Sequence, residues 1–267
     1  MNPEPVVPSE GWGVLHLFFH LRRELLADSE SAAKDFAGRL QAFNARDDYQ
    51  ALAFSVLGQK ADLGLMVLGP DLAQLDQLAI ELAASPLGEA LLPAGSYVSM
   101  TELSEYTTSE AEESARLTAE ENLVAGSTEH AEALEAFRQR MASYNEHRLH
   151  PKLPAKKVIS FYPMSKRREG ADNWYSLPFG DRKQVMAGHA RIGRTYRGRV
   201  LQLITGSVGI DDWEWGVTLL ADDPKALKDV VYEMRFDEAS ARYGEFGPFV
   251  TGLLQEPDEL LRHLGLL

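Results

Sequence analysis

The feature that most constrains this 267-residue chain is an order of predicted elements that occurs twice. Alternating and helical apolar patterns predict the order βαββαβ up to residue 106, and the same order returns after Lys156. The middle hairpins of both copies have a Gly and Asp turn, followed by a helix that begins after Asp. This duplication predicts an α+β fold of two ferredoxin-like halves that pack or join, as in a dimeric α+β barrel.

The element boundaries predict three segments along the chain. In the first copy we expect strands at 11–20, 51–57, 63–68 and 97–106, and helices at 29–46 and 71–84. In the second copy we expect strands at 158–164, 200–205, 213–220 and 246–253, and helices at 181–195, 224–234 and 257–264. The predicted domains are an N-terminal half at 1–108, an acidic helical connector at 109–156 and a C-terminal half at 157–267.

Composition excludes several kinds of site. The chain has no cysteine, which rules out disulfides, thiolate-held iron–sulfur clusters and Cys-bound zinc, so a metal would be held by His or carboxylate. The start lacks the basic and apolar regions of a signal peptide, and no stretch approaches the roughly 18 apolar residues of a membrane span. We therefore expect a cytoplasmic protein without a membrane partner.

The charge is distributed unevenly. The net charge of −13 argues against a nucleic-acid partner, yet residues 138–199 contain 15 Lys or Arg against 4 Asp or Glu. A basic stretch within an acidic protein predicts a site for a small polyanionic ligand. The alternative is that these residues form solvated helix faces.

His189 differs from the other histidines in its position on a helix. It shares a helical spacing with Val185, Ile192 and Tyr196, which puts its imidazole on the stripe that faces the sheet. A lone histidine on such a face is most often a hydrogen-bonded core residue. The competing interpretation is an axial ligand to a haem-like iron.

Two strands carry further candidates. The two-residue period places Gln202 between Val200 and Ile204 on one face, where its amide would bond backbone or hold a small molecule over a metal. The same period places Tyr162 on one face of its strand, with Lys166 near the strand end. A phenol beside cations suits redox or anion-binding chemistry, although a packed tyrosine followed by solvated lysines is commoner.

Five sequence blocks together resemble a known family. They are FYPMSKRR at 161–168, GHARIGRTYRGRV at 188–200, LQLITGS at 201–207, DDWEWGVTLLADDP at 211–224 and YEMRFDEASARYGEFGPF at 232–249. In this order they are similar to the coproheme decarboxylases, the haem-synthesis branch of the chlorite dismutase family. The resemblance is dense over about 145–255, and only the element order agrees in the N-terminal half. The Ala190 that follows His189 departs from the Gly of many relatives.

The resemblance implies a homopentamer whose subunits bind iron coproporphyrin III in the C-terminal half. It implies that His189 is the iron ligand, that Tyr162 and Lys166 are catalytic, and that Gln202 lies above the iron. The other ligand-binding positions it implies are Arg148 and Ser240, which would hold anionic groups, and Pro163, Met164, Ser165 and Trp174. Glu233 or Glu238 is the expected acceptor for the second nitrogen of the iron ligand.

The resemblance also implies a reaction. Hydrogen peroxide would oxidise the bound iron, Tyr162 would give up an electron and a proton, and its radical would take hydrogen from a propionate β-carbon. Two rounds would release two CO₂ and leave haem b. Chlorite-degrading members have arginine where this chain has Gln202, so a chlorite dismutase-like or peroxidase-like enzyme is the first alternative and a non-enzymatic haem carrier the second. A transient contact with coproporphyrin ferrochelatase is a further expectation.

Overall fold

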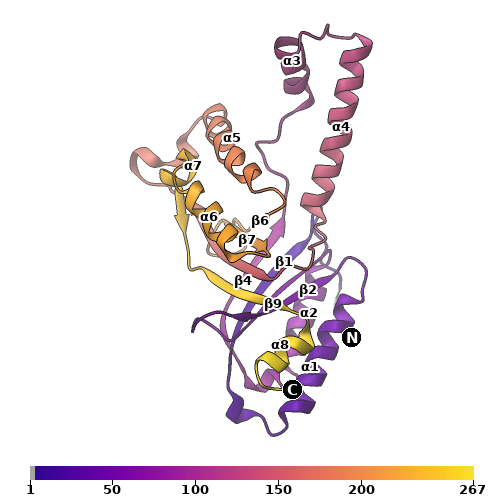
Figure 1. Cartoon of the computed structure of the whole chain (residues 1–267), viewed down its shortest axis with the longest axis vertical. Coiled ribbons are helices and arrows are strands. Elements are labelled where there is room, and N and C mark those ends of the chain that lie inside the picture. The colour runs from indigo at the N-terminus through magenta and orange to yellow at the C-terminus, as the bar shows by residue number, and fades with distance from the viewer. Residues whose placement is uncertain (1–3) are drawn as a thin grey trace.

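The computed structural model describes residues 4–267, and its strands form a single sheet (Figure 1). The N-terminal half contributes four strands in the spatial order β4-β1-β3-β2. Their bounds are β1 Gly13–Leu21, β2 Gln50–Val56, β3 Leu63–Gly69 and β4 Leu91–Thr101. Every neighbouring pair among them is antiparallel. This order is the ferredoxin-like arrangement that the duplication predicts.

The C-terminal half repeats the arrangement and closes it into a barrel. Its strands are β5 Val158–Lys166, β6 Val200–Gly206, β7 Trp215–Ala221, β8 Gly244–Phe246 and β9 Val250–Gln255. β4 pairs with β6 at one seam and β2 pairs with β9 at the other, while β5 pairs with β7. The predicted α+β fold of two joined ferredoxin-like halves is therefore confirmed.

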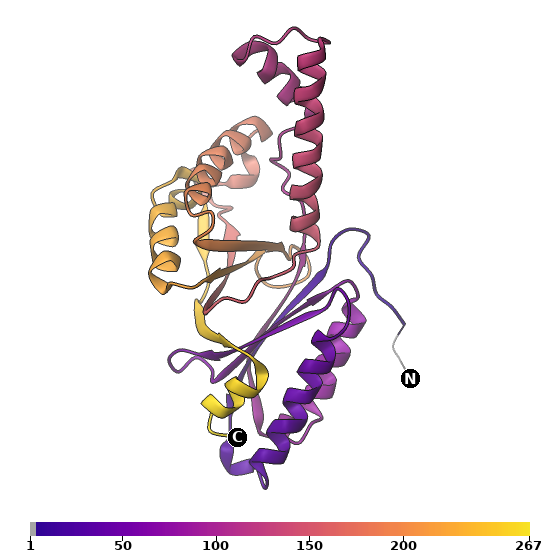
Figure 2. The ribbon, with the colours of Figure 1, turned by 45° about the vertical axis from the view of Figure 1, so that its right-hand side comes forward.

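Helices cover the outer face of each half (Figure 2). The N-terminal half carries α1 Ser29–Asn44 and α2 Leu72–Ala83, and short 3₁₀ turns at Arg23–Leu25 and Gly88–Ala90. The C-terminal half carries α5 Phe179–Thr195, α6 Pro224–Met234 and α7 Glu238–Ala241, and 3₁₀ turns at Gly170–Asp172 and Trp174–Ser176. The last helix, α8 Pro257–His263, packs beside α1. The sequence assigns α8 to the C-terminal half, whereas its Leu260 and Leu261 belong to the N-terminal core.

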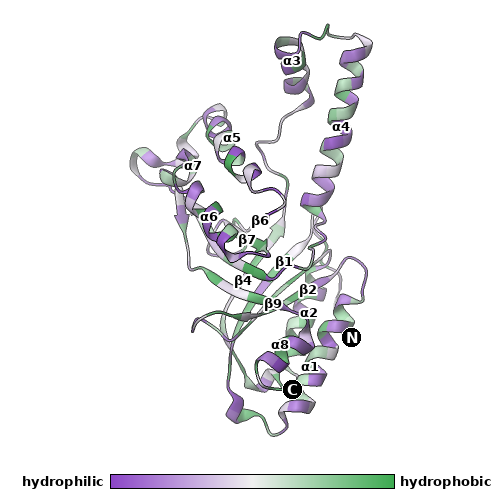
Figure 3. Cartoon of the chain, in the orientation of Figure 1, coloured by the Kyte–Doolittle hydropathy of each residue, from purple (hydrophilic) through white to green (hydrophobic). Residues whose placement is uncertain are grey.

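The connector forms two helices that project from the barrel (Figures 1 and 2). α3 (Glu110–Glu120) begins with a capping box of Ser109 and Glu112, and α4 (Thr128–Leu149) returns toward the barrel. Polar residues are frequent along both helices (Figure 3). Among residues 4–267, no helix combines the length and the apolar character that crossing a membrane requires.

Two strand predictions are wrong in their boundaries. The strand expected at 97–106 is β4, which begins six residues earlier and ends at Thr101, its last residue paired with β6. The strand expected at 246–253 is interrupted between β8 and β9. Alternation along the remaining strands predicts their faces well, as Phe161 lies inside the barrel and Tyr162 outside it.

Candidate functional site

α5 lies over the C-terminal half without burying any of its own residues. Val185, His189 and Ile192 follow one another at helical spacing, and all three remain partly exposed. Only Tyr196, just past the helix, is buried. The helix instead contacts α6 and α7 at its sides. An amphipathic helix whose inner stripe is only partly covered leaves room for a ligand between itself and the sheet.

The imidazole of His189 is fixed by a carboxylate. Its Nδ1 lies 2.8 Å from Oδ2 of Asp237, which begins α7, and the Ser240 hydroxyl donates to the same oxygen at 3.2 Å. Burial pushes the pKa of Asp237 upward, but these hydrogen bonds outweigh it and the pKa is lowered. The ionised carboxylate holds the proton of His189 on Nδ1. Nε2 has no hydrogen bond to any residue in 4–267 and is the nitrogen able to bind a metal.

The expected acceptor for His189 is therefore corrected. Neither Glu233 nor Glu238 bonds its imidazole, because Glu238 pairs with Arg242 on the side of α7 and Glu233 lies beside Tyr196. Asp237 takes the role through its position at the beginning of a four-residue helix. An Asp directly before a predicted helix is a capping signal that sequence analysis can find.

Tyr162 lies on the outer face of β5 and is 5% exposed. Its ring stacks on Phe249 with centroids 4.2 Å apart. Burial raises the pKa of Tyr162 to about 12, with Arg235 acting weakly in the opposite direction. The hydroxyl forms no hydrogen bond within residues 4–267. The phenol is therefore neutral and has its O–H available for a ligand.

Lys166 ends the same strand on the same face and is 7% exposed. Its ammonium lies 4.4 Å from the ring centroid of Trp174 and donates to the carbonyl of Ala239 at 3.1 Å. Burial lowers the pKa of Lys166 to about 8, against the opposing charges of Asp237 and Glu214. No carboxylate of the described chain lies within ion-pair distance of it, so this buried cation is suited to an anionic ligand.

Gln202 approaches α5 from the sheet. It lies on β6 with its amide against Gly193, where an added Cβ would come within 3.4 Å of Nε2. Gly193 follows His189 by one helical turn. His189, the predicted iron ligand, and Gln202, the residue predicted above the iron, therefore lie on two elements that face each other.

Arg148 is farther from this group. It projects from the end of α4 and donates to the backbone carbonyl of Glu102 at 3.1 Å, while its Nε is buried without a partner. The Glu102 carboxylate accepts from Nε1 of Trp215 at 3.1 Å, and Trp215 pairs with Met164 of β5. Arg148 is therefore connected to β5 through Glu102 and Trp215 and makes no hydrogen bond to β5 itself.

The remaining predicted contacts are divided between the faces of β5. Met164 shares the outer face with Tyr162 and packs in the same apolar cluster. Ser165 points the other way, and its hydroxyl accepts from the backbone N–H of Glu214 at 3.3 Å. Pro163 lies opposite Gly216 and its carbonyl accepts from Gly247. A ligand on the outer face would meet these last two residues mainly through backbone.

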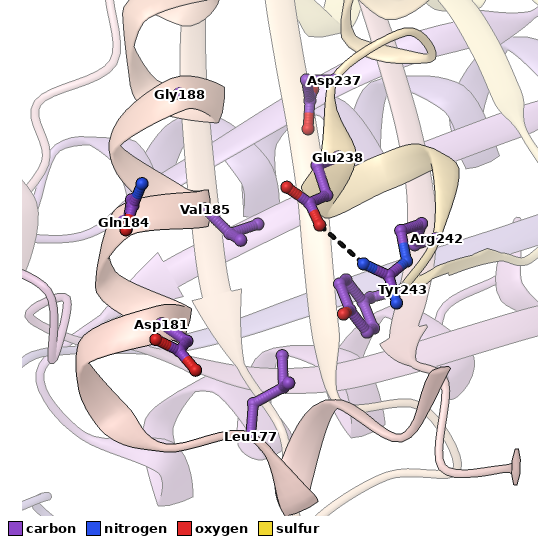
Figure 4. A pocket seen from close by; sticks show the side chains of 9 residues that line it. All are labelled: Leu177, Asp181, Gln184, Val185, Gly188, Asp237, Glu238, Arg242 and Tyr243. Carbon is purple, nitrogen blue, oxygen red and sulfur yellow. Dashed lines mark hydrogen bonds and ion pairs between the residues drawn. The ribbon is translucent and has the colours of Figure 1, made fainter. Parts of the chain in front are cut away.

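A cavity of about 400 Å³ lies between α5 and α7 (Figure 4). Val185 points into it from α5, and Glu238 and Tyr243 approach it from the α7 side. Gly188, next to His189, and Asp237 also line it. The size falls within the usual range for small-molecule sites.

These features fit an anionic iron porphyrin. An imidazole with a free Nε2 suits haem iron, and Lys166 is a buried donor that lacks an anionic partner. The partly covered inner stripe of α5 supplies an apolar wall. His189 would hold the iron, and Lys166 would hold a carboxylate.

Comparison with known proteins agrees with the fold. The family model described as chlorite dismutase matches residues 22–255. A structure described as a novel heme-binding protein from Thermus thermophilus is 35% identical, with a TM-score of 0.78, and the match covers 100% of this chain and 99% of that one. A mutant chlorite dismutase from Candidatus Nitrospira defluvii has 16% identity and a TM-score of 0.71 over 96% of both chains, a similarity of fold alone.

Proposed function

This chain belongs to the chlorite dismutase family, and from that premise we propose that it converts iron coproporphyrin III to haem b with hydrogen peroxide. The haem-binding description of the 35% identical Thermus protein supports an iron porphyrin as the ligand. The sequence blocks around Tyr162, His189 and Gln202 support the decarboxylase branch.

One observation carries the proposal: short helix α7 lies against both the predicted iron ligand and the buried cation. Asp237 bonds His189, and two residues later the carbonyl of Ala239 bonds Lys166. Tyr162 lies four residues before Lys166 on the same strand face. We infer from these contacts that the imidazole, the ammonium and the phenol act on one ligand bound between α5 and the sheet.

The overall reaction is balanced for each propionate. One propionic acid side chain and one H₂O₂ give a vinyl group, CO₂ and two H₂O, so two rounds consume two peroxides. The iron porphyrin supplies the oxidation by peroxide when it is bound. Tyr162 gives up one electron and one proton from its O–H and regains a hydrogen atom from the propionate β-carbon. The carbon radical then loses a second electron to the remaining oxidising equivalent of the peroxide, as the bond to the carboxylate breaks and CO₂ leaves. A phenylalanine at this position keeps the packing and lacks the O–H.

Lys166 orients the reacting carboxylate. Because burial lowers its pKa to about 8, the side chain holds a proton at neutral pH that it can share with a bound propionate. A charge-assisted bond of this kind contributes about 1.5–3 kcal/mol. The neutral amide of Gln202 places no cation on its side of the ligand, which favours this reaction over chlorite decomposition.

The test is a peroxide titration of the protein loaded with iron coproporphyrin III. Mass spectrometry of the extracted porphyrin follows the loss of the first and then the second carboxyl group. We expect both losses in the natural protein, neither in Tyr162→Phe, and both in the control Tyr49→Phe, which alters a phenol of the N-terminal half. Normal haem b formation by Tyr162→Phe would remove this phenol from the reaction. Oxygen release from added chlorite at a comparable rate would favour the chlorite dismutase-like alternative.

A further inference from the structure

β8 and β9 both pair with β5, but their registers differ by one residue. Phe246 of β8 lies opposite Met164, whereas Val250 of β9 lies opposite Phe161. Between these pairs, two residues of β5 face the three residues 247–249. The extra residue is a β-bulge, a feature that often redirects side chains beside functional sites.

The bulge changes which face the two phenylalanines occupy. Phe246 and Phe249 are three residues apart, so in a regular strand they would point to opposite faces. Here both belong to the apolar cluster on the outer face, and their ring centroids lie 6.0 Å and 4.2 Å from that of Tyr162. Gly247 permits the close approach, because an added Cβ would lie 2.7 Å from the Pro163 ring. The extra residue thus brings both phenylalanine rings close to the ring of Tyr162.

Residues from two other parts of the chain contact these two phenylalanines. Lys60, exposed in the turn between β2 and β3, donates through Nζ to the carbonyl of Phe249 at 2.5 Å. Arg235, after α6, lies over the ring of Phe246 at 4.3 Å. The N-terminal half therefore contacts the backbone next to the phenol of the C-terminal half.

We propose that Phe249 is a positioning residue for Tyr162 and that Lys60 sets the position of Phe249. The inference rests on the proposed function, because it assigns the orientation of the phenol that the reaction uses. No hydrogen bond from the described chain orients the hydroxyl of Tyr162. The torsion that turns a tyrosine ring has a broad energy profile, so ring packing alone sets this orientation.

The first test is the ionisation of Tyr162 in the protein without porphyrin. The absorbance of tyrosinate is measured as a function of pH for each protein. The curve of the same protein with Tyr162→Phe added is subtracted from it, so that the difference reports the ionisation of Tyr162 alone. We expect the midpoint to fall by about one pH unit in Phe249→Leu, because a smaller, non-planar side chain admits water to the phenol. Phe249→Tyr should restore the natural midpoint, since it keeps the ring.

The second test is the rate of haem b formation by the loaded protein. Phe249→Leu should lower this rate about tenfold, and its affinity for iron coproporphyrin should change less than about twofold. Lys60→Met should lower the rate about threefold, and the control Lys34→Met, an exposed lysine on α1, should leave it unchanged. Lys60→Met changes only an exposed side chain, so it tests the proposal even if Phe249→Leu does not fold.

The outcomes separate this inference from the proposed function. An unchanged ionisation midpoint in Phe249→Leu would overturn the positioning role, whatever the activity. A natural protein that forms no haem b would overturn the proposed function, while the ionisation of Tyr162 still reports on Phe249. Equal rates of haem b formation in Lys60→Met and the natural protein would contradict the proposal that Lys60 sets the position of Phe249.

Discussion

α1 and α5 hold the same place in the two halves, yet they pack in opposite ways. Each follows the first strand of its βαββαβ unit. α1 buries six apolar side chains against its sheet, including Phe36 and Leu40, whereas α5 buries none in 17 residues. The second helices do not differ in this way, since α2 buries Leu75 and its neighbours and α6 buries Leu227 and its neighbours. Of the four helices α1, α2, α5 and α6, only α5 buries none of its residues.

In this duplicated scaffold, the helix that fills the core of one half is free to cover a ligand in the other half. In the N-terminal half the space under the helix is filled by side chains and stabilises the fold. In the C-terminal half the corresponding stripe of α5 contains Gly188, His189 and Gly193. The two glycines beside the imidazole leave room where the other half has Phe36.

The largest effect expected from this comparison is on stability. Phe36→Ala should lower the free energy of unfolding by about 3–5 kcal/mol, because it opens a cavity in a filled core. Ile192→Ala on α5 should cost less than about 1 kcal/mol in the protein without ligand, since its side chain is already partly exposed. Urea denaturation followed by circular dichroism measures both, and equal losses would break the comparison.

The next effect concerns ligand binding. His189→Ala should weaken the binding of iron coproporphyrin by more than about 100-fold, which exceeds the loss expected when only a hydrogen-bond partner of an iron ligand is removed. The change in the Soret band during titration measures the affinity. His147→Ala, on the surface of α4, is the matched control. An unchanged spectrum in His189→Ala would place the iron ligand elsewhere.

A smaller effect is expected from the carboxylate behind the imidazole. Asp237→Asn keeps an oxygen for the Nδ1 proton of His189 but removes the charge, and it should weaken porphyrin binding by about 10–100-fold. Asp229→Asn, on the neighbouring helix α6, loses only its pair with Lys225 and should bind normally. Equal losses in both variants would assign the effect to the net charge near α5 instead of this hydrogen bond.

The smallest effect concerns the barrel that joins the two halves. His16 of β1 lies fully inside it, with Nε2 3.0 Å from the Thr218 hydroxyl of β7, and burial lowers the pKa of His16 to about 3. The unfolded chain takes up this proton near pH 6.5 and the folded chain does not, so stability falls as the pH drops below 6.5.

The expected slope for His16 is at most about 1.4 kcal/mol per pH unit. Urea unfolding between pH 7 and pH 5 measures it before most carboxylates titrate. His16→Leu should remove this component, and the same slope in the variant would assign it to other groups. The effect should be equal with and without porphyrin, because the barrel interior is separate from the α5 site.

Much of the site was predictable because its residues obey local periods. The spacing along α5 placed His189 on the inner stripe, and alternation placed Tyr162 and Met164 on one strand face, with Lys166 near the strand end. Asp237 was missed because its contact with His189 spans 48 residues and no period links them. Phe249 was missed because an interrupted strand changes the alternation on which the prediction depends.

By itself the sequence determined the duplicated βαββαβ units, the faces of most strands and the one helix that carries a histidine toward the sheet. These follow from apolar periods that act within some 10 residues of chain. Only the tertiary structure decided that β4 joins β6, that β2 joins β9 and that α8 crosses to the N-terminal core. It also decided that α5 stays open, because the filling of a space depends on side chains from distant segments and is not encoded in any local pattern.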